Sequence, residues 1–173
     1  MTTPPVLASV VASLTHAAAP WKHVYDDSKV LETIVVFVHL AALLVGGGIA
    51  LATDRATLRA LRGDAGERER QLAELGLTHR IVVPALLVAF LSGVLLFFAD
   101  VETFATSIAF WIKMALVALL LFNGLLMTRY ETALRRSSTG DAVPWSRLRT
   151  TAVASGVLWL ATLLAGVALT NAS

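Results

Sequence analysis

The sequence predicts an all-α polytopic membrane protein, a four-helix bundle preceded by a short amphipathic helix that lies in the membrane interface. The first observation is composition: 57% of the 173 residues are hydrophobic and only 15% are charged, with a mean hydropathy of +0.74. Soluble domains are less apolar and more charged. The second is that the apolar residues form four blocks long enough to cross a bilayer. The third is that arginines occur in only two of the connections between these blocks.

Composition also excludes several classes of site. The chain has no cysteine, which rules out disulfides, thiolate metal sites, iron–sulfur clusters and covalently attached c-type haem. The sequence contains no Walker loop, GxSxG or HExxH motif. The net charge of +2 does not indicate nucleic-acid binding, because the basic residues are sorted by side of the membrane.

Residues 1–29 are predicted to form the N-terminal interfacial segment. Apolar residues recur there at helical spacing, namely Val6, Leu7, Val10, Val11 and Leu14. This stretch is too short to cross the membrane, so we expect an amphipathic helix that ends at Pro20. The run Ala17 to Ala19 also fits a signal-peptide cleavage site, which is an alternative for this segment.

Residues 30–170 are predicted to form the bundle, with spans at about 30–53, 81–99, 108–128 and 150–170. The polar connection 54–80 is expected to be either a helical hairpin that projects from the membrane or a solvated helical loop. A short acidic link joins the second and third spans. The fourth span is rich in Ala, Ser and Gly, which favour close helix packing.

The distribution of basic residues predicts the orientation. All eleven arginines lie within 54–80 and 129–149, whereas the opposite side carries only Lys22, Lys29 and Lys113. The positive-inside rule places both arginine-rich connections in the cytoplasm and both termini outside. We therefore expect a multi-pass protein of the bacterial cytoplasmic (inner) membrane with periplasmic termini.

The first span contains the candidate site. His39 lies in the middle of an apolar run, and Gly46, Gly47 and Gly48 follow seven to nine residues later. Residues i and i+7 share one helix face, and ionisable groups inside a membrane usually have a partner or a function. This arrangement predicts a haem b site, with His39 as iron ligand and Gly46 and Gly47 beside the porphyrin. The alternative is that the glycines only permit a neighbouring helix to pack closely.

Other polar residues are candidate partners of His39. His79 lies at the opposite membrane face, about 20 Å deeper at 1.5 Å per residue, so the two histidines cannot share one haem. Lys113 lies closer to His39 in depth and is expected either to pair with a haem propionate or another carboxylate, or to extend to the headgroups. A copper site formed by His16, His23, Asp26 and His39 is a weaker alternative, because these residues have no regular ligand spacing.

Three segments carry a resemblance to known proteins: VHLAALLVGGG with Arg55 sixteen residues after His39, HRIVVPALLVAFLSG, and FWIKMALVALLLFNGLL. Over residues 31–130 the chain resembles small four-helix bacterial membrane proteins, among them the oxygen-independent protoporphyrinogen oxidases and the CopD-type copper-resistance proteins. The oxidase resemblance implies haem b held by a first-span histidine, a nearby arginine and a Trp/Lys pair. The matching positions here are His39, Arg55, Trp111 and Lys113.

These observations lead to alternative expectations for function. The first is a b-type haem protein in electron transfer or in porphyrin- or quinol-linked redox chemistry, which would be an oxidoreductase if it is an enzyme. The second is a non-catalytic subunit of a larger respiratory or photosynthetic membrane complex. Copper or other metal-ion transport is a weaker third. The expected partners are the lipid bilayer, a quinone or porphyrin, and a larger complex or a second copy of the chain.

Overall fold

The computed structural model describes residues 5–136 and 142–172, and this part of the chain is helical apart from short turns. Six helices follow one another: α1 (Pro5–Asp27), α2 (Lys29–Ala60), α3 (Ala65–Ala99), α4 (Val101–Thr106), α5 (Ile108–Arg136) and α6 (Ala142–Ala172). Four of them, α2, α3, α5 and α6, are long and apolar enough to cross a membrane. The predicted all-α, multi-pass membrane fold is therefore confirmed.

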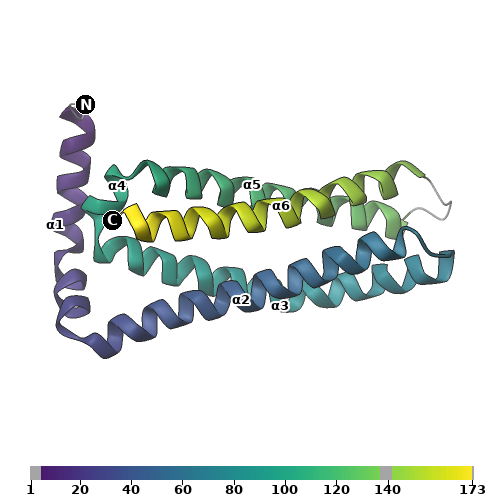
Figure 1. Ribbon diagram of the computed structural model, residues 1–173, viewed down its shortest axis with the longest axis horizontal. Coiled ribbons are helices and arrows are strands. Elements are labelled where there is room, and N and C mark those ends of the chain that lie inside the picture. The colour runs from purple at the N-terminus through teal and green to yellow at the C-terminus, as the bar shows by residue number, and fades with distance from the viewer. Residues whose placement is uncertain (1–4, 137–141, 173) are drawn as a thin grey trace.

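The long helices form two hairpins that pack side by side (Figure 1). Helix α2 packs along α3, and α5 packs along α6. The two hairpins meet mainly through α2 and α6, whereas α3 and α5 contact each other only slightly. The α2–α3 connection, the end of α5 and the start of α6 lie at one end of the bundle, and α1, α4 and the end of α6 lie at the other. The two ends of the chain are thus on the same side of the bundle, as an even number of crossings requires.

The helices extend beyond the predicted spans at the arginine-rich end. Helix α2 continues to Ala60, and α3 begins at Ala65, where the Asp64 side chain caps it by accepting a hydrogen bond from the Glu67 amide. Residues 54–80 form a helical hairpin, in which a short turn joins the end of α2 to the first turns of α3. A leucine from the α3 part of this hairpin helps to explain why the helices continue here. Leu75 is buried with Leu134 and Leu148, so the α5–α6 hairpin continues alongside it.

Helix α1 crosses the end of the bundle at a steep angle to the long helices (Figure 1). The indole Nε1 of Trp21 donates to the Leu95 carbonyl at 2.9 Å, and the Lys22 ammonium donates to the Ala99 carbonyl at 3.1 Å. Both acceptors are in the last two turns of α3, and the Ala99 carbonyl is one of the four at the helix end that lack amide partners within the helix. Ala18 packs against α4 in the same region. These contacts fix α1 across the bundle end.

The expected helix end at Pro20 is wrong, because α1 continues through it to Asp27. Proline removes one amide donor and leaves the carbonyl four residues earlier without its partner. Pro20 and His16 are both exposed, so that carbonyl can be hydrated. The hydrogen bonds of Trp21 and Lys22 hold the helix on the far side of the proline. The short link after α3 also differs from expectation, since it forms α4, capped by the Asp100 carboxylate.

Candidate functional site

His39 lies between α2 and α3, in the half of the bundle nearer α1. Its Nδ1 is 2.9 Å from the Ala89 carbonyl oxygen and 3.0 Å from the Ser92 hydroxyl. A Cβ atom added at Gly93 would lie 3.2 Å from His39 Cε1. Three small residues of α3 therefore form a notch that accepts the imidazole. The Ser92–Gly93 pair permits this approach, because any larger side chain at position 93 would displace the ring.

These contacts define the hydrogen-bonding state of the imidazole. A backbone carbonyl can only accept, so the Nδ1 of His39 carries the proton that is donated to Ala89. The Ser92 hydroxyl is itself a donor to the carbonyls of Val88 and Ala89, at 2.6 and 3.1 Å. In the neutral ring, Nε2 then holds a lone pair. Metal-bound histidines characteristically have this arrangement, in which the non-ligating nitrogen donates to a carbonyl or carboxylate.

Lys113 of α5 lies on the interior side of the bundle near α6. A Cβ atom added at Gly166 would be 3.7 Å from the Lys113 ammonium, so the absence of a side chain at Gly166 provides space for it. The charge of the ammonium is felt at His39 over a longer distance, and the described residues of helices α2 and α5 make no direct contact. Among the described residues, no carboxylate or hydrogen-bond acceptor is paired with Lys113. The site therefore combines a potential ligand with an unneutralised cation.

Gly46 and Gly47 serve helix packing. A Cβ atom at Gly46 would lie 3.2 Å from the Ala85 Cβ, and one at Gly47 would lie 3.0 Å from Cε3 and Cζ3 of the Trp159 ring. The surface that was expected to receive a porphyrin is thus covered by α3 and by an indole that is only 3% exposed. Gly48 differs, since no heavy atom of the described residues lies within 4 Å of a Cβ atom added there.

Arg55 and Trp111 lie apart from His39. Arg55 is exposed on α2, sixteen residues from His39 and so about 24 Å farther along the helix. Trp111 is 57% exposed, and its indole Nε1 donates to the Ala105 carbonyl at 3.0 Å. Because residues i and i+2 of a helix project about 200° apart, Trp111 and Lys113 point to different sides of α5. Of the residues expected at the site, His39 packs on α3 and Lys113 lies beside Gly166 of α6, and no direct contact joins the two side chains among the described residues.

His79 belongs to a separate polar group at the arginine-rich end. Its Nδ1 is 3.6 Å from a carboxylate oxygen of Glu131, which also pairs with Arg135 at 2.9 Å. On α3, His79 precedes the contacts of His39 by ten or more residues, which corresponds to at least about 15 Å. The inference that the two histidines do not share one metal agrees with these positions.

The described residues contain no group of three or more His, Asp or Glu side chains arranged to hold a metal ion. His23 on α1 is instead paired with Asp27 at 2.9 Å on an exposed surface. The weaker copper alternative, which requires His16, His23, Asp26 and His39 to converge, is therefore not supported by the geometry.

Two polar residues of the interior were not singled out from the sequence as part of a site. Asp54 is 5% exposed on α2, where its carboxylate lies near Ser155 of α6 and its Oδ2 has no hydrogen-bond partner among the described residues. Thr162 is buried on α6, and its hydroxyl has no hydrogen-bond partner among the described residues. Asp54 follows Gly47 by seven residues, and this spacing places both on the same helix face. This seven-residue spacing is the feature of the sequence from which the burial of Asp54 could have been predicted.

Comparison with protein-family models, with curated proteins and with solved structures finds no match to this chain.

Proposed function

We propose that the protein is an integral membrane b-type haem protein that functions in electron transfer, with His39 as an axial ligand. The observation that carries the proposal is the hydrogen bond from His39 Nδ1 to the Ala89 carbonyl within the bundle. It leaves Nε2 as the ligating atom and fixes the ring plane. In this orientation the imidazole would present Nε2 to the iron of a haem.

Lys113 completes the proposed site. Haem b carries two propionates, and an ammonium without a described carboxylate partner would neutralise one of them. Gly46 and Gly47 are not part of this site, because Ala85 and Trp159 cover them. Bound haem would supply one-electron transfer. The chain's own residues would orient the ligand, balance the propionate charge and exclude water. Following the resemblance to membrane protoporphyrinogen oxidases, we extend the proposal to a porphyrin or quinol as the electron partner.

An absorption spectrum tests the proposal directly. The full chain, purified in mild detergent from cells supplied with haem precursor, is expected to show a Soret band and, after dithionite reduction, an α-band. His39→Ala should abolish both bands. His79→Ala is the matched control and should retain them, since His79 pairs with Glu131 in a separate polar group. Absence of haem bands in the wild-type protein, also after addition of haemin, or an unchanged spectrum in His39→Ala, contradicts the proposal.

Lys113 has a different expected effect. In Lys113→Met the bands should remain while the reduction potential rises or falls measurably, because one charge near the haem has been removed. Lys113→Arg, which keeps the charge, should restore most of the wild-type potential. A potential that is the same in all three proteins would remove Lys113 from the site.

One observation favours the second candidate, a non-catalytic subunit of a larger membrane complex. Gly48 on α2 and Gly124 on α5 are exposed, and no heavy atom lies within 4 Å of a Cβ added at either. Small residues on an exposed helix face allow another transmembrane helix to approach closely. Stoichiometric copurification with a large complex, lost in Gly48→Leu and accompanied by no haem bands, would support this candidate instead.

A further inference from the structure

A basic pocket at the arginine-rich end of the bundle has no role in the proposed haem site. It has a volume of about 490 Å³ and lies between the α2–α3 hairpin and the first turns of α6. The residues that matter for its chemistry are Leu58, Arg62, Arg68, Trp145, Arg149 and Val153. Three guanidinium groups from different segments of the chain therefore border one cavity.

Among the residues that the structure describes, no acidic side chain lines this pocket. None of its three arginines forms an ion pair with a carboxylate in the part of the chain that is described. At the same end, Arg135 differs, because Glu131 neutralises it at 2.9 Å. The pocket thus concentrates positive charge that other residues do not balance, which favours an anionic ligand.

Arg68 is held in position by neighbouring residues and still has N–H groups that can donate hydrogen bonds to a ligand. Its Nη2 donates to the Leu61 carbonyl at 3.2 Å, and its guanidinium lies 5.8 Å from the centre of the Trp145 ring. The Nε–H is buried and has no hydrogen-bond acceptor in the described part of the chain. A buried donor without a partner is costly, and a phosphate oxygen in the pocket would satisfy it. The planar guanidinium is also suited to bidentate recognition of phosphate.

One side of the pocket is apolar and continues along the transmembrane surface. Val153, one turn after Arg149 on α6, is 49% exposed. Leu58 lies on the facing helix α2, five residues past the apolar run. Tryptophan, represented here by Trp145, is typical of the membrane interface. A ligand that matches the pocket has a phosphate group next to hydrocarbon.

We propose that this pocket binds the phosphate group of an anionic phospholipid whose acyl chain lies against Leu58 and Val153. The recognised chemistry is a phosphate ester, and the apolar wall favours a lipid over a soluble phosphate as its source. Basic pockets between transmembrane helices bind lipid headgroups in this way.

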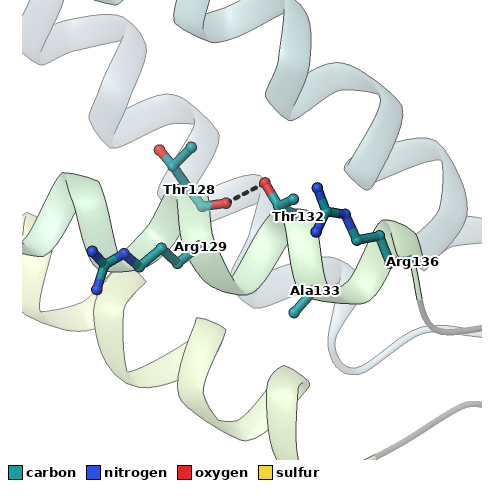
Figure 2. Close-up of a pocket in the computed structure, with 5 residues that line it drawn as sticks. All are labelled: Thr128, Arg129, Thr132, Ala133 and Arg136. Atoms are coloured by element: carbon teal, nitrogen blue, oxygen red, sulfur yellow. Dashed lines mark hydrogen bonds between the residues drawn. The ribbon is translucent and has the colours of Figure 1, made fainter.

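A second basic pocket supplies a matched control. Figure 2 shows that its lining residues, Thr128, Arg129, Thr132, Ala133 and Arg136, all come from α5 and that its two guanidinium groups lie apart. The Thr132 hydroxyl donates to the Thr128 carbonyl of its own helix at 2.8 Å. This pocket is smaller, at about 310 Å³, and no facing helix contributes to its lining. Its arginines carry the same charge at the same end of the bundle without converging.

The test measures lipid retention by the full chain in mild detergent by native mass spectrometry. Phosphatidylglycerol is titrated against phosphatidylcholine. The wild-type protein is expected to retain phosphatidylglycerol preferentially. Arg68→Gln and Arg149→Gln should each weaken the affinity for phosphatidylglycerol about tenfold or more, since each loses a charged hydrogen bond. Arg68→Lys should recover only part of the affinity. Arg129→Gln should bind as the wild type does.

Two outcomes overturn the proposal. An equal loss in Arg129→Gln would show that general surface charge, and not this pocket, attracts the lipid. Displacement of phosphatidylglycerol by millimolar inorganic phosphate, with direct phosphate binding that Arg68→Gln abolishes, would assign the pocket to a soluble phosphate. If Arg68→Gln fails to fold, Arg62→Gln and Arg149→Gln still decide the question, because both positions are exposed. None of these readouts depends on haem.

Discussion

The contact between Gly47 and Trp159 gives a quantitative prediction for Gly47→Ala. The added methyl group would lie 3.0 Å from two carbons of the Trp159 ring, whereas carbon atoms prefer a separation of about 3.5 to 4.0 Å. The rigid indole is 3% exposed, so it cannot turn aside into open space. Overpacking of this kind costs about 1 to 3 kcal/mol, and the better helix propensity of alanine returns about 0.5 to 1 kcal/mol. The net loss lies between about 0 and 2.5 kcal/mol, and we expect a value near the middle of this range, about 1 kcal/mol.

The measurement is the free energy of unfolding in mixed micelles, from denaturing-detergent titrations followed by far-ultraviolet circular dichroism. Gly48→Ala is the matched control on the next residue of the same helix. Because no atom lies within 4 Å of its added methyl group, it should be neutral or slightly stabilising. A double-mutant cycle with Trp159→Leu isolates the contact, since the smaller side chain leaves room for the methyl group. The coupling energy should be at least about 0.5 kcal/mol in favour of the double variant.

Equal stability of Gly47→Ala and Gly48→Ala, or strict additivity in the cycle, would refute the packing of Trp159 on Gly47. Such a result would also leave the Gly46–Gly47 surface free, as a porphyrin against this helix face requires. The experiment therefore decides between the two uses of the glycines that the sequence left open.

Three further predictions concern other contacts of the bundle. Asn123 is buried and donates from Nδ2 to the Thr151 carbonyl at 2.9 Å, so Asn123→Leu should lower the free energy of unfolding by about 1 kcal/mol; an unchanged value would mean that this interhelical bond contributes nothing. Trp21→Phe removes the hydrogen bond to the Leu95 carbonyl, and amide hydrogen exchange should then increase in α1 but not in α2, whereas uniform exchange would contradict docking of α1 through Trp21. Glu131→Gln removes the negative charge that pairs with Arg135 and His79, so the free energy of unfolding should fall by about 1 to 3 kcal/mol. A free energy of unfolding equal to that of the wild type would contradict this prediction.

The expected features that the structure confirms follow from local properties of the chain. Four apolar blocks specify four spanning helices, because only structures that satisfy their own backbone hydrogen bonds cross a membrane. Ser28 caps α2 and Asp64 caps α3, and both are residue types that favour the start of a helix. His39 was identifiable for the same reason, since an imidazole within an apolar run is costly unless it has a partner.

The errors and omissions concern contacts between distant segments. Pro20 does not end α1, because hydrogen bonds to the last turns of α3 hold the helix beyond it. The use of Gly47 depends on an indole more than a hundred residues away in the sequence. The burial of Asp54 depends on the position of α6, which brings Ser155 to it.

The sequence by itself determined the class of protein, the number of crossings and the residues capable of chemistry, because hydropathy and charge act locally along the chain. Only the tertiary structure decided which of those residues meet. It joined His39 to Ala89 and Ser92 and placed Lys113 beside Gly166. It left Arg55 and Trp111 outside and placed three arginines around one pocket. The physical reason is that helices in a membrane associate through the shape of their surfaces and interhelical hydrogen bonds, and neither is encoded in the periodicity of a single helix.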